Sequence, residues 1–178
     1  MDLTDAFVAQ SREYLTRHYL PKIRLAVEPL GDDDLWWRPN EASNSIGNLL
    51  LHLEGNLRQW ILSGLGGSPD RRDRAAEFAR REPLPRARLL GLFATVVGEV
   101  DAVLARADGA LLARRFAIQG RQVTGLQAIY HVVEHVSYHA AQIIYIAKLR
   151  TGSDLGFYTV EAGVARAAWP GRPESGSA

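Results

Sequence analysis

The chain has 178 residues, of which 47% are hydrophobic and 23% are charged, so it is long enough for one domain with a buried core. The net charge of +1 leaves no strong field to attract nucleic acid or an anionic membrane surface. The absence of cysteine excludes disulfides and every cysteine-ligated zinc or iron–sulfur site. With no membrane span or signal peptide visible, we expect a cytoplasmic protein.

Helical periodicity dominates the first half of the chain. The first predicted helix begins near Thr4 and ends before Pro29, with a kink or break expected at Pro21, which cannot donate a backbone hydrogen bond. The second helix follows the capping residues 43–45 and ends at the glycine-rich run 63–69. A charged link of about 20 residues comes next and is interpreted as a solvated crossover, longer than an ordinary helix–helix turn.

The second half of the chain continues in the same way. A third helix follows Pro85 and runs to Leu104, and a fourth runs from about Thr124 to Leu149, with short extended pieces expected in the connection 107–123. The predicted fold class is therefore all-α, a four-helix bundle with a long crossover between helices 2 and 3. We expect one domain over residues 1–160 and a disordered tail over residues 161–178.

The fourth helix carries three histidines at helical spacing. His131, His135 and His139 are four residues apart, so they lie along one stripe of a largely apolar helix. Single buried histidines often only form hydrogen bonds in a core, but three on one apolar helix would each need a buried partner. Two imidazoles four residues apart can share one cation, which makes a metal ion the simplest explanation.

A further ligand is expected from another helix, and His18 and His52 are the candidates. His52 lies among core leucines, whereas His18 lies near Pro21 and is interpreted as an ordinary surface or interface residue. Asn48 and Asn56 lie one turn on either side of His52. They are predicted either to form hydrogen bonds within the core or to support the metal ligands and line the cavity beside them. His52 is therefore the preferred third ligand.

A second interpretation of the same segment is a zinc hydrolase. Residues 131–135 match the H-x-x-E-H pattern of inverted zinc peptidases, in which Glu134 would be the general base. Such enzymes have a larger fold and a distant acidic ligand, and few residues follow His135, so chance accounts better for the match.

Two segments carry a resemblance to a known family. Residues 44–60, reading NSIGNLLLHLEGNLRQW, resemble helix 2 of the DinB/YfiT-like metalloprotein superfamily, and His135-x-x-x-His139-x-x-Gln142 resembles its closing helix. The order of the helices and the Trp36–Pro39 segment are similar to one bacterial branch of that superfamily. The one visible departure is Ala141, where the family has glycine.

The resemblance implies a four-helix bundle that holds one divalent metal ion, zinc or nickel, through His52, His135 and His139. By the same resemblance, His131 is one turn too early for the usual triad, and with Gln142 it would support the ligands or line the cavity. Relatives in this superfamily transfer low-molecular-weight thiols of the bacillithiol or mycothiol type to electrophiles, so the resemblance implies metal-dependent thiol transfer, with the thiol or electrophile as a small-molecule partner.

Alternatives to that function stay open at this point. They are a non-catalytic metal-binding or stress-associated helical bundle, because fold and ligands do not determine chemistry, and the zinc hydrolase described above. The sequence nominates no catalytic acid, catalytic base or thiol-binding residue. It also leaves open whether the chain forms a homodimer through an exposed helix face.

Overall fold

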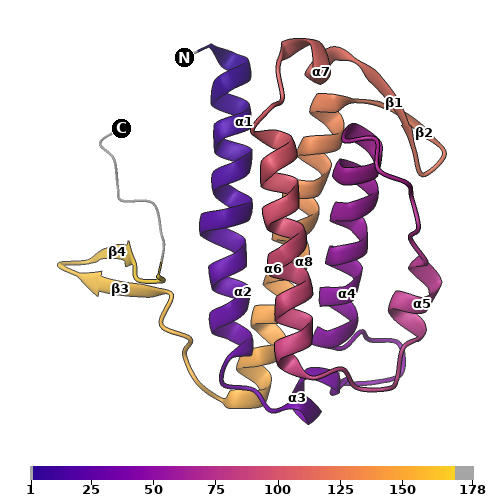
Figure 1. The fold of residues 1–178 in the computed structure, drawn as a ribbon. Helices are drawn as coiled ribbons and strands as arrows, with labels where there is room; N and C mark the ends of the chain where they lie inside the picture. The colour runs from indigo at the N-terminus through magenta and orange to yellow at the C-terminus, as the bar shows by residue number, and fades with distance from the viewer. Residues whose placement is uncertain (1, 171–178) are drawn as a thin grey trace.

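Four long helical segments dominate the computed structural model of the chain, which describes residues 2–170 (Figure 1). The first segment is formed without interruption by α1, η1 and α2, and the second by α4 and η2. The bounds are α1 Leu3–Glu13, η1 Tyr14–Tyr19, α2 Leu20–Val27, α4 Ile46–Leu57, η2 Arg58–Leu65, α6 Arg86–Leu104 and α8 Gly125–Thr151. Shorter elements connect them: α3 Asp32–Trp36, α5 Arg74–Ala79, α7 Gly109–Ala113, β1 Arg115–Ile118, β2 Arg121–Thr124, β3 Tyr158–Glu161 and β4 Val164–Ala167.

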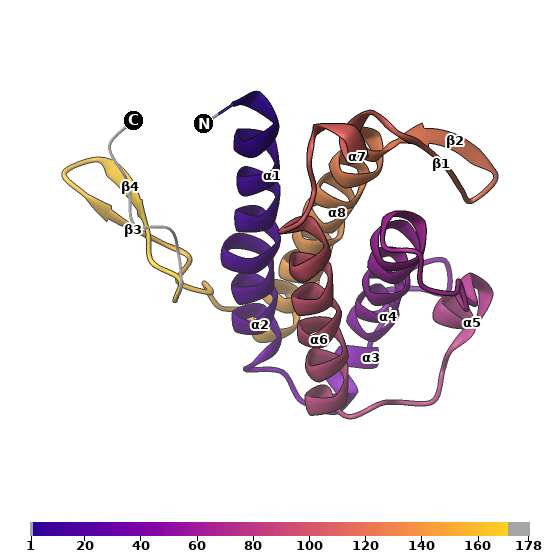
Figure 2. The ribbon, with the colours of Figure 1, turned by 45° about the horizontal axis from the view of Figure 1, so that its top comes forward.

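Each long segment turns an apolar face toward one common core. Ile23, Leu53, Phe93 and Val132 come from the four different segments, and none of them is exposed to solvent. This burial is what the helical repeat of apolar residues predicts, since residues three and four apart share one face. In Figures 1 and 2, α4 lies between α8 on one side and α5 on the other.

Side-chain caps fix where the two site-bearing helices begin. Ser45 accepts a hydrogen bond from the backbone N–H of Asn48, and Thr124 accepts one from that of Gln127. In both helices the residue at the third position also reaches back to the cap, which satisfies backbone groups that would otherwise lack partners. The predicted starts of these two helices are therefore confirmed, whereas the first helix is capped by Asp2 rather than by Thr4.

The first segment stays helical through Pro21, where a kink or break was expected. The structure has a π-helical stretch, η1, immediately before the proline, which lies in the first turn of α2. A proline has no N–H to close the ordinary helical hydrogen bond, and the wider π-helical turn accommodates that loss without ending the helix.

The crossover over residues 66–85 is more ordered than the sequence predicted. It contains α5, whose start is capped by Asp73 through a hydrogen bond from the backbone N–H of Ala76. Asn48 Nδ2 of α4 donates to the carbonyl oxygens of Glu77 and Arg80, at 2.8 and 3.2 Å. A buried amide on α4 therefore holds α5 in place.

Two antiparallel strand pairs correct the all-α prediction. β1 pairs with β2, where short extended pieces were expected, and β3 pairs with β4 beyond the last helix. The prediction of disorder from residue 161 does not fit residues 161–170. There β4 is followed by Trp169, which is 3% exposed and donates through Nε1 to the carbonyl oxygen of Arg17 at 2.9 Å. The remainder of the predicted tail, residues 171–178, lies outside the described residues.

Among residues 2–170, no helix combines the length and the apolar character that crossing a membrane would require.

Candidate metal centre

Three histidine side chains meet between α4 and α8. His52 comes from the middle of α4, and His135 and His139 come from successive turns of α8. Nε2 of His52 lies 2.9 Å from Nε2 of His135, and each of the three rings offers a nitrogen within 4.8 Å of the other two. His52 and His139 are buried and His135 is partly buried. The structure thus brings together the three residues that the sequence resemblance selected as ligands.

The planes of the three imidazole rings are steeply inclined to one another. The ring centroids of His135 and His139 are 4.5 Å apart with an angle of 85° between the planes, and His52 makes angles of 66° and 84° with them. Spacing of four residues on α8 places the two imidazoles on the same face, and the neighbouring α4 supplies the third from the opposite direction.

The donor set and its spacing fit a divalent cation. Zinc–imidazole bonds of about 2.0–2.1 Å at tetrahedral angles place ligand nitrogens about 3.4 Å apart, which lies between the 2.9 Å contact and the 4.8 Å limit of the cluster. Burial, helped by the neighbouring His139 and His52, lowers the pKa of His135 to about 3. Burial also lowers the pKa of His139. Uncharged rings at neutral pH leave nitrogen lone pairs free to bind a metal.

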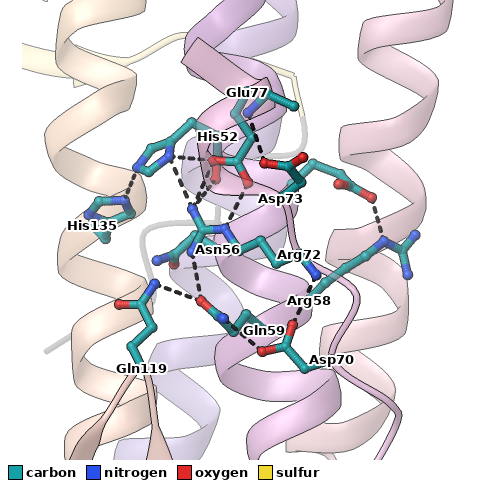
Figure 3. Close-up of polar contacts among 12 residues, drawn as sticks. His52, Asn56, Arg58, Gln59, Asp70, Arg72, Asp73, Glu77, Gln119 and His135 are labelled. Carbon is teal, nitrogen blue, oxygen red and sulfur yellow. Dashed lines mark hydrogen bonds and ion pairs between the residues drawn. The ribbon is translucent and has the colours of Figure 1, made fainter. Parts of the chain in front are cut away.

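A buried carboxylate orients His52 from the side away from α8 (Figure 3). Glu77 Oε2 of α5 lies 2.8 Å from Nδ1 of His52. A carboxylate at this distance accepts the Nδ1 proton, so Nε2 keeps its lone pair and faces the other histidines. In the metal-free protein, His135 can donate its own Nε2 proton to that lone pair.

Arg72 holds the carboxylate in turn. Its Nε lies 2.7 Å from Oε1 of Glu77 and its Nη2 lies 3.0 Å from Oε2, a two-point contact in which both side chains are less than 10% exposed. Burial alone would raise the pKa of Glu77, but hydrogen bonds from His52 and Arg72 and the charge of Arg72 outweigh it and lower the pKa. The carboxylate therefore stays ionised beside His52.

A glycine on α4 makes room for this ion pair. A Cβ atom added to Gly55 would lie 2.1 Å from Oε1 of Glu77 and 3.1 Å from Nε of Arg72. These distances are below normal van der Waals contact, so the close approach of the crossover to α4 depends on the missing side chain.

The polar contacts continue from Arg72 to the β1–β2 hairpin. Nη1 of Arg72 donates to Oε1 of Gln59 at 3.0 Å, and Gln119 at the tip of the hairpin donates to the same oxygen at 2.6 Å (Figure 3). Gln59 donates to Asp70 at 2.7 Å. Side chains from three separate parts of the chain therefore surround the partners of His52.

The residues predicted to support the ligands have distinct roles. Oε1 of Gln142 lies 2.7 Å from Nδ1 of His139 and orients that ring. The ring centroids of His131 and Trp60 are 4.0 Å apart, and Nε2 of His131 lies 3.4 Å from Nδ2 of Asn56. Asn48 supports the site indirectly, because its side chain positions α5 and does not contact a histidine.

The other two sequence candidates lie outside the cluster. His18 packs against Trp169, with 5.2 Å between ring centroids, as expected for a residue with no part in the site. Glu134 is exposed and lines a separate hollow of about 400 Å³ with Tyr19 and Tyr138. His131, which the H-x-x-E-H interpretation needs as a ligand, is not one of the three clustered histidines.

Sequence reasoning missed Glu77, Arg72 and Gly55. The available signal was Asp73, a good helix cap, followed by the helix-favouring run 74–79 with a single acidic residue. Nothing in that run has a metal-binding spacing, since Glu77 acts through His52.

Comparison with known proteins assigns the chain to a family. Residues 2–164 match the family model described as protein of unknown function DUF1572. No curated protein matches the sequence. The structure is similar to a conserved protein from Enterococcus faecalis, with a TM-score of 0.70 at 16% identity over 86% of this chain and 99% of that one. It is also similar to the DinB-like protein YjoA from Bacillus subtilis, with a TM-score of 0.63 at 20% identity over 83% of this chain and 96% of that one. The resemblance found in the sequence is confirmed: the chain belongs to the DUF1572 family and has a DinB-like fold.

Proposed function

We propose that His52, His135 and His139 bind one divalent metal ion, zinc or nickel. The observation that carries the proposal is the convergence of three buried or partly buried ring nitrogens within 4.8 Å, supplied by two helices. Hydrogen-bond partners on the outer nitrogens of His52 and His139 support it, since metal-binding histidines commonly have such partners. The surrounding four long segments would then form a DinB-type four-helix bundle, with residues 66–85 as its long crossover.

Metal analysis tests this first proposal. Protein purified without a histidine tag should contain about one equivalent of metal, and H52A and H139A should each lose most of it because two imidazoles rarely suffice. H18A is the matched control, since His18 packs against Trp169 instead. Full metal content in both H52A and H139A would contradict the assignment.

We further propose that the centre serves metal-dependent transfer of a low-molecular-weight thiol, of the bacillithiol or mycothiol type, to an electrophile. A bound divalent ion would stabilise the thiolate form of such a cofactor at neutral pH. Three protein ligands leave a coordination position for an external group, as in catalytic zinc sites. The chain itself has no cysteine, so the thiol has to come from outside.

The residues of the chain would prepare the site for that chemistry. Glu77 accepts the Nδ1 proton of His52 and fixes the ring, and Gln142 orients His139. Arg72 keeps the carboxylate of Glu77 ionised, so His52 stays in the form that presents Nε2.

A cofactor screen tests thiol transfer. Metal-loaded and metal-stripped protein are mixed with each thiol and a generic electrophile, and the conjugate is measured by mass spectrometry. We expect conjugation above the uncatalysed rate only with loaded protein, and its loss in H139A. Metal binding without conjugation by any thiol would favour the alternative, a non-catalytic metal-binding bundle.

A further inference from the structure

The exposed face of α8 is apolar, unlike that of α6. Five of the ten large apolar side chains that are exposed among residues 2–170 lie on α8, at Leu126, Tyr130, Tyr138, Tyr145 and Leu149. Each of them is 46–66% exposed, and the only Asp, Glu, Lys or Arg between Gly125 and Ala147 is Glu134. The exposed positions of α6 instead include Arg88, Thr95 and Glu99. Because a surface helix normally turns charged residues toward water, the face of α8 is typical of a helix that packs against a further partner.

The order of these side chains is symmetric about the middle of α8. The leucines lie at the two ends of the face, Tyr130 and Tyr145 lie about one turn further in, and Tyr138 lies beside the midpoint. When two copies of one helix pack in opposite directions about a two-fold axis, each residue lies opposite the residue at the mirrored position. Tyr130 of one copy would then lie opposite Tyr145 of the other, so the face is complementary to a second copy of itself.

The spacing of the face fits a common mode of helix packing. One row of residues four apart consists of Tyr130, Glu134 and Tyr138, and a second consists of Ala141, Tyr145 and Leu149. Rows of this spacing interdigitate when two helices cross at about −50°, the commonest class in globular proteins. The symmetric order and the row spacing are therefore compatible with the same dimer.

A hollow on this face can receive a side chain from the second copy. It has a volume of about 400 Å³, and its lining is Tyr19, Tyr130, Val133, Glu134, Ser137 and Tyr138. The carboxylate of Glu134 forms no ion pair with any of residues 2–170. The phenol of Tyr145 from the second copy, opposite Tyr130, can donate a hydrogen bond to such a carboxylate. The one charged residue at the centre of the face would thus gain a partner.

The area of the face is sufficient for a specific interface. At the exposures given above, the five large side chains present on the order of 500 Å² in each copy, since an aromatic side chain has about 150–250 Å². Two copies would therefore bury on the order of 1,000 Å², the size at which specific protein interfaces begin. Exposed tyrosines are also the side chains that such interfaces favour.

We propose that the chain forms a two-fold symmetric homodimer in which the α8 helices of two copies pack in opposite directions. Tyr145 of each copy would enter the hollow of the other beside Tyr130 and Glu134. Because Tyr138 packs against His139 with 5.1 Å between ring centroids, the interface would reach the edge of the candidate metal centre.

Sedimentation velocity of charge variants tests both the dimer and its pairing. The unmodified protein should be mainly dimeric at about 50 µM. Y130E/Y145E would place glutamates opposite each other at both ends and should raise the dimer dissociation constant by at least about 100-fold. Y130E/Y145K would place Glu opposite Lys instead and should recover most of that loss. Y158E, which changes a 55% exposed tyrosine of β3, is the matched control and should remain dimeric.

A single-cysteine variant tests the position of the two-fold axis. The chain has no cysteine of its own, so in Y138C the only thiols of a dimer would be the two beside the axis. Mild oxidation should link Y138C into covalent dimers and leave Y158C, the control, mostly unlinked. Circular dichroism checks that each variant is folded. A monomeric unmodified protein, a dimer that survives Y130E/Y145E, or equal cross-linking of the two cysteine variants would overturn the proposal.

Discussion

His52 lies between two regions whose sequences differ greatly in how clearly they indicate a function. On one side α8 presents His135 and His139 in a regular helical repeat, and on the other the crossover presents Glu77 and Arg72 with no recognisable spacing. Both regions contact the same imidazole, one at each nitrogen. The comparison teaches that the clustered ring nitrogens of α8 can be found by periodicity, whereas the groups that orient His52 come from a packed connection.

The largest effect is expected from the crossover side. R72A would leave the buried carboxylate of Glu77 without its cation and should lower the free energy of unfolding by about 3–5 kcal/mol. R58A removes an arginine whose own side chain is 41% exposed and should cost about 0–1 kcal/mol. Urea denaturation of the metal-free proteins measures both. Equal losses would show that the crossover ion pair is no more important than a surface pair.

The second prediction compares the hydrogen-bond partners of two proposed ligands, His52 and His139. E77Q removes the charge beside His52 and should weaken metal affinity by about 10–100-fold, the range measured for such hydrogen-bond partners. Q142L removes the neutral amide beside His139 and should have a smaller effect, because a neutral acceptor polarises the ring less. Competition with a chelating dye gives both affinities, and E54Q is the control. A larger effect of Q142L would reverse the proposed order.

The third prediction concerns the space between the two regions. G55A would place a methyl group against Glu77 and should cost about 1–3 kcal/mol of stability as the crossover is pushed from α4. G98A makes the same change on α6, where an added Cβ would meet no atom within 4 Å beyond its chain neighbours and the surrounding helix backbone, and should stabilise the protein by about 0.4–1 kcal/mol. Urea denaturation should therefore give opposite signs. Stabilisation by G55A would contradict the close approach seen here.

The fourth prediction is a pH dependence that belongs to the α8 side. The pKa of His135 falls from an ordinary 6.5 to about 3 on folding, so the unfolded chain binds more protons between these values. In the metal-free protein, the part of the free energy of unfolding that depends on uncharged His135 should be fully present above pH 6.5. It should be lost as the pH falls toward 3. H135Q should show a shallower decline of the urea midpoint between pH 7 and pH 4. A decline as steep as that of the unmodified protein would show that His135 is not a source of the pH dependence.

Much of the fold could be predicted because its signals are local. Ser45 and Thr124 cap helices through bonds to residues three positions on, and the apolar repeat of α8 identifies its buried face. The spacing of four residues, which is also a local signal, predicted that His135 and His139 share one face of the helix. His52 came from its position among core leucines and from the family resemblance.

The remaining features depend on contacts between distant residues. Glu77 meets His52 across 25 positions, and Asn48 fixes α5 by bonding to backbone carbonyls, which any residue would provide. Trp169 meets Arg17 across 152 positions, in a segment whose composition alone is typical of disorder. Periodicity carries no information about such pairings.

The contact of Trp169 with the first helical segment has a practical consequence for studies in solution. Trp169 covers His18, whose pKa is lowered by burial and by the nearby charge of Lys22. Deleting residues 157–178 would return His18 to water and raise its pKa toward 6.5. An NMR titration of this one imidazole would therefore report whether residues 157–170 are docked, independently of anything bound at the histidine cluster.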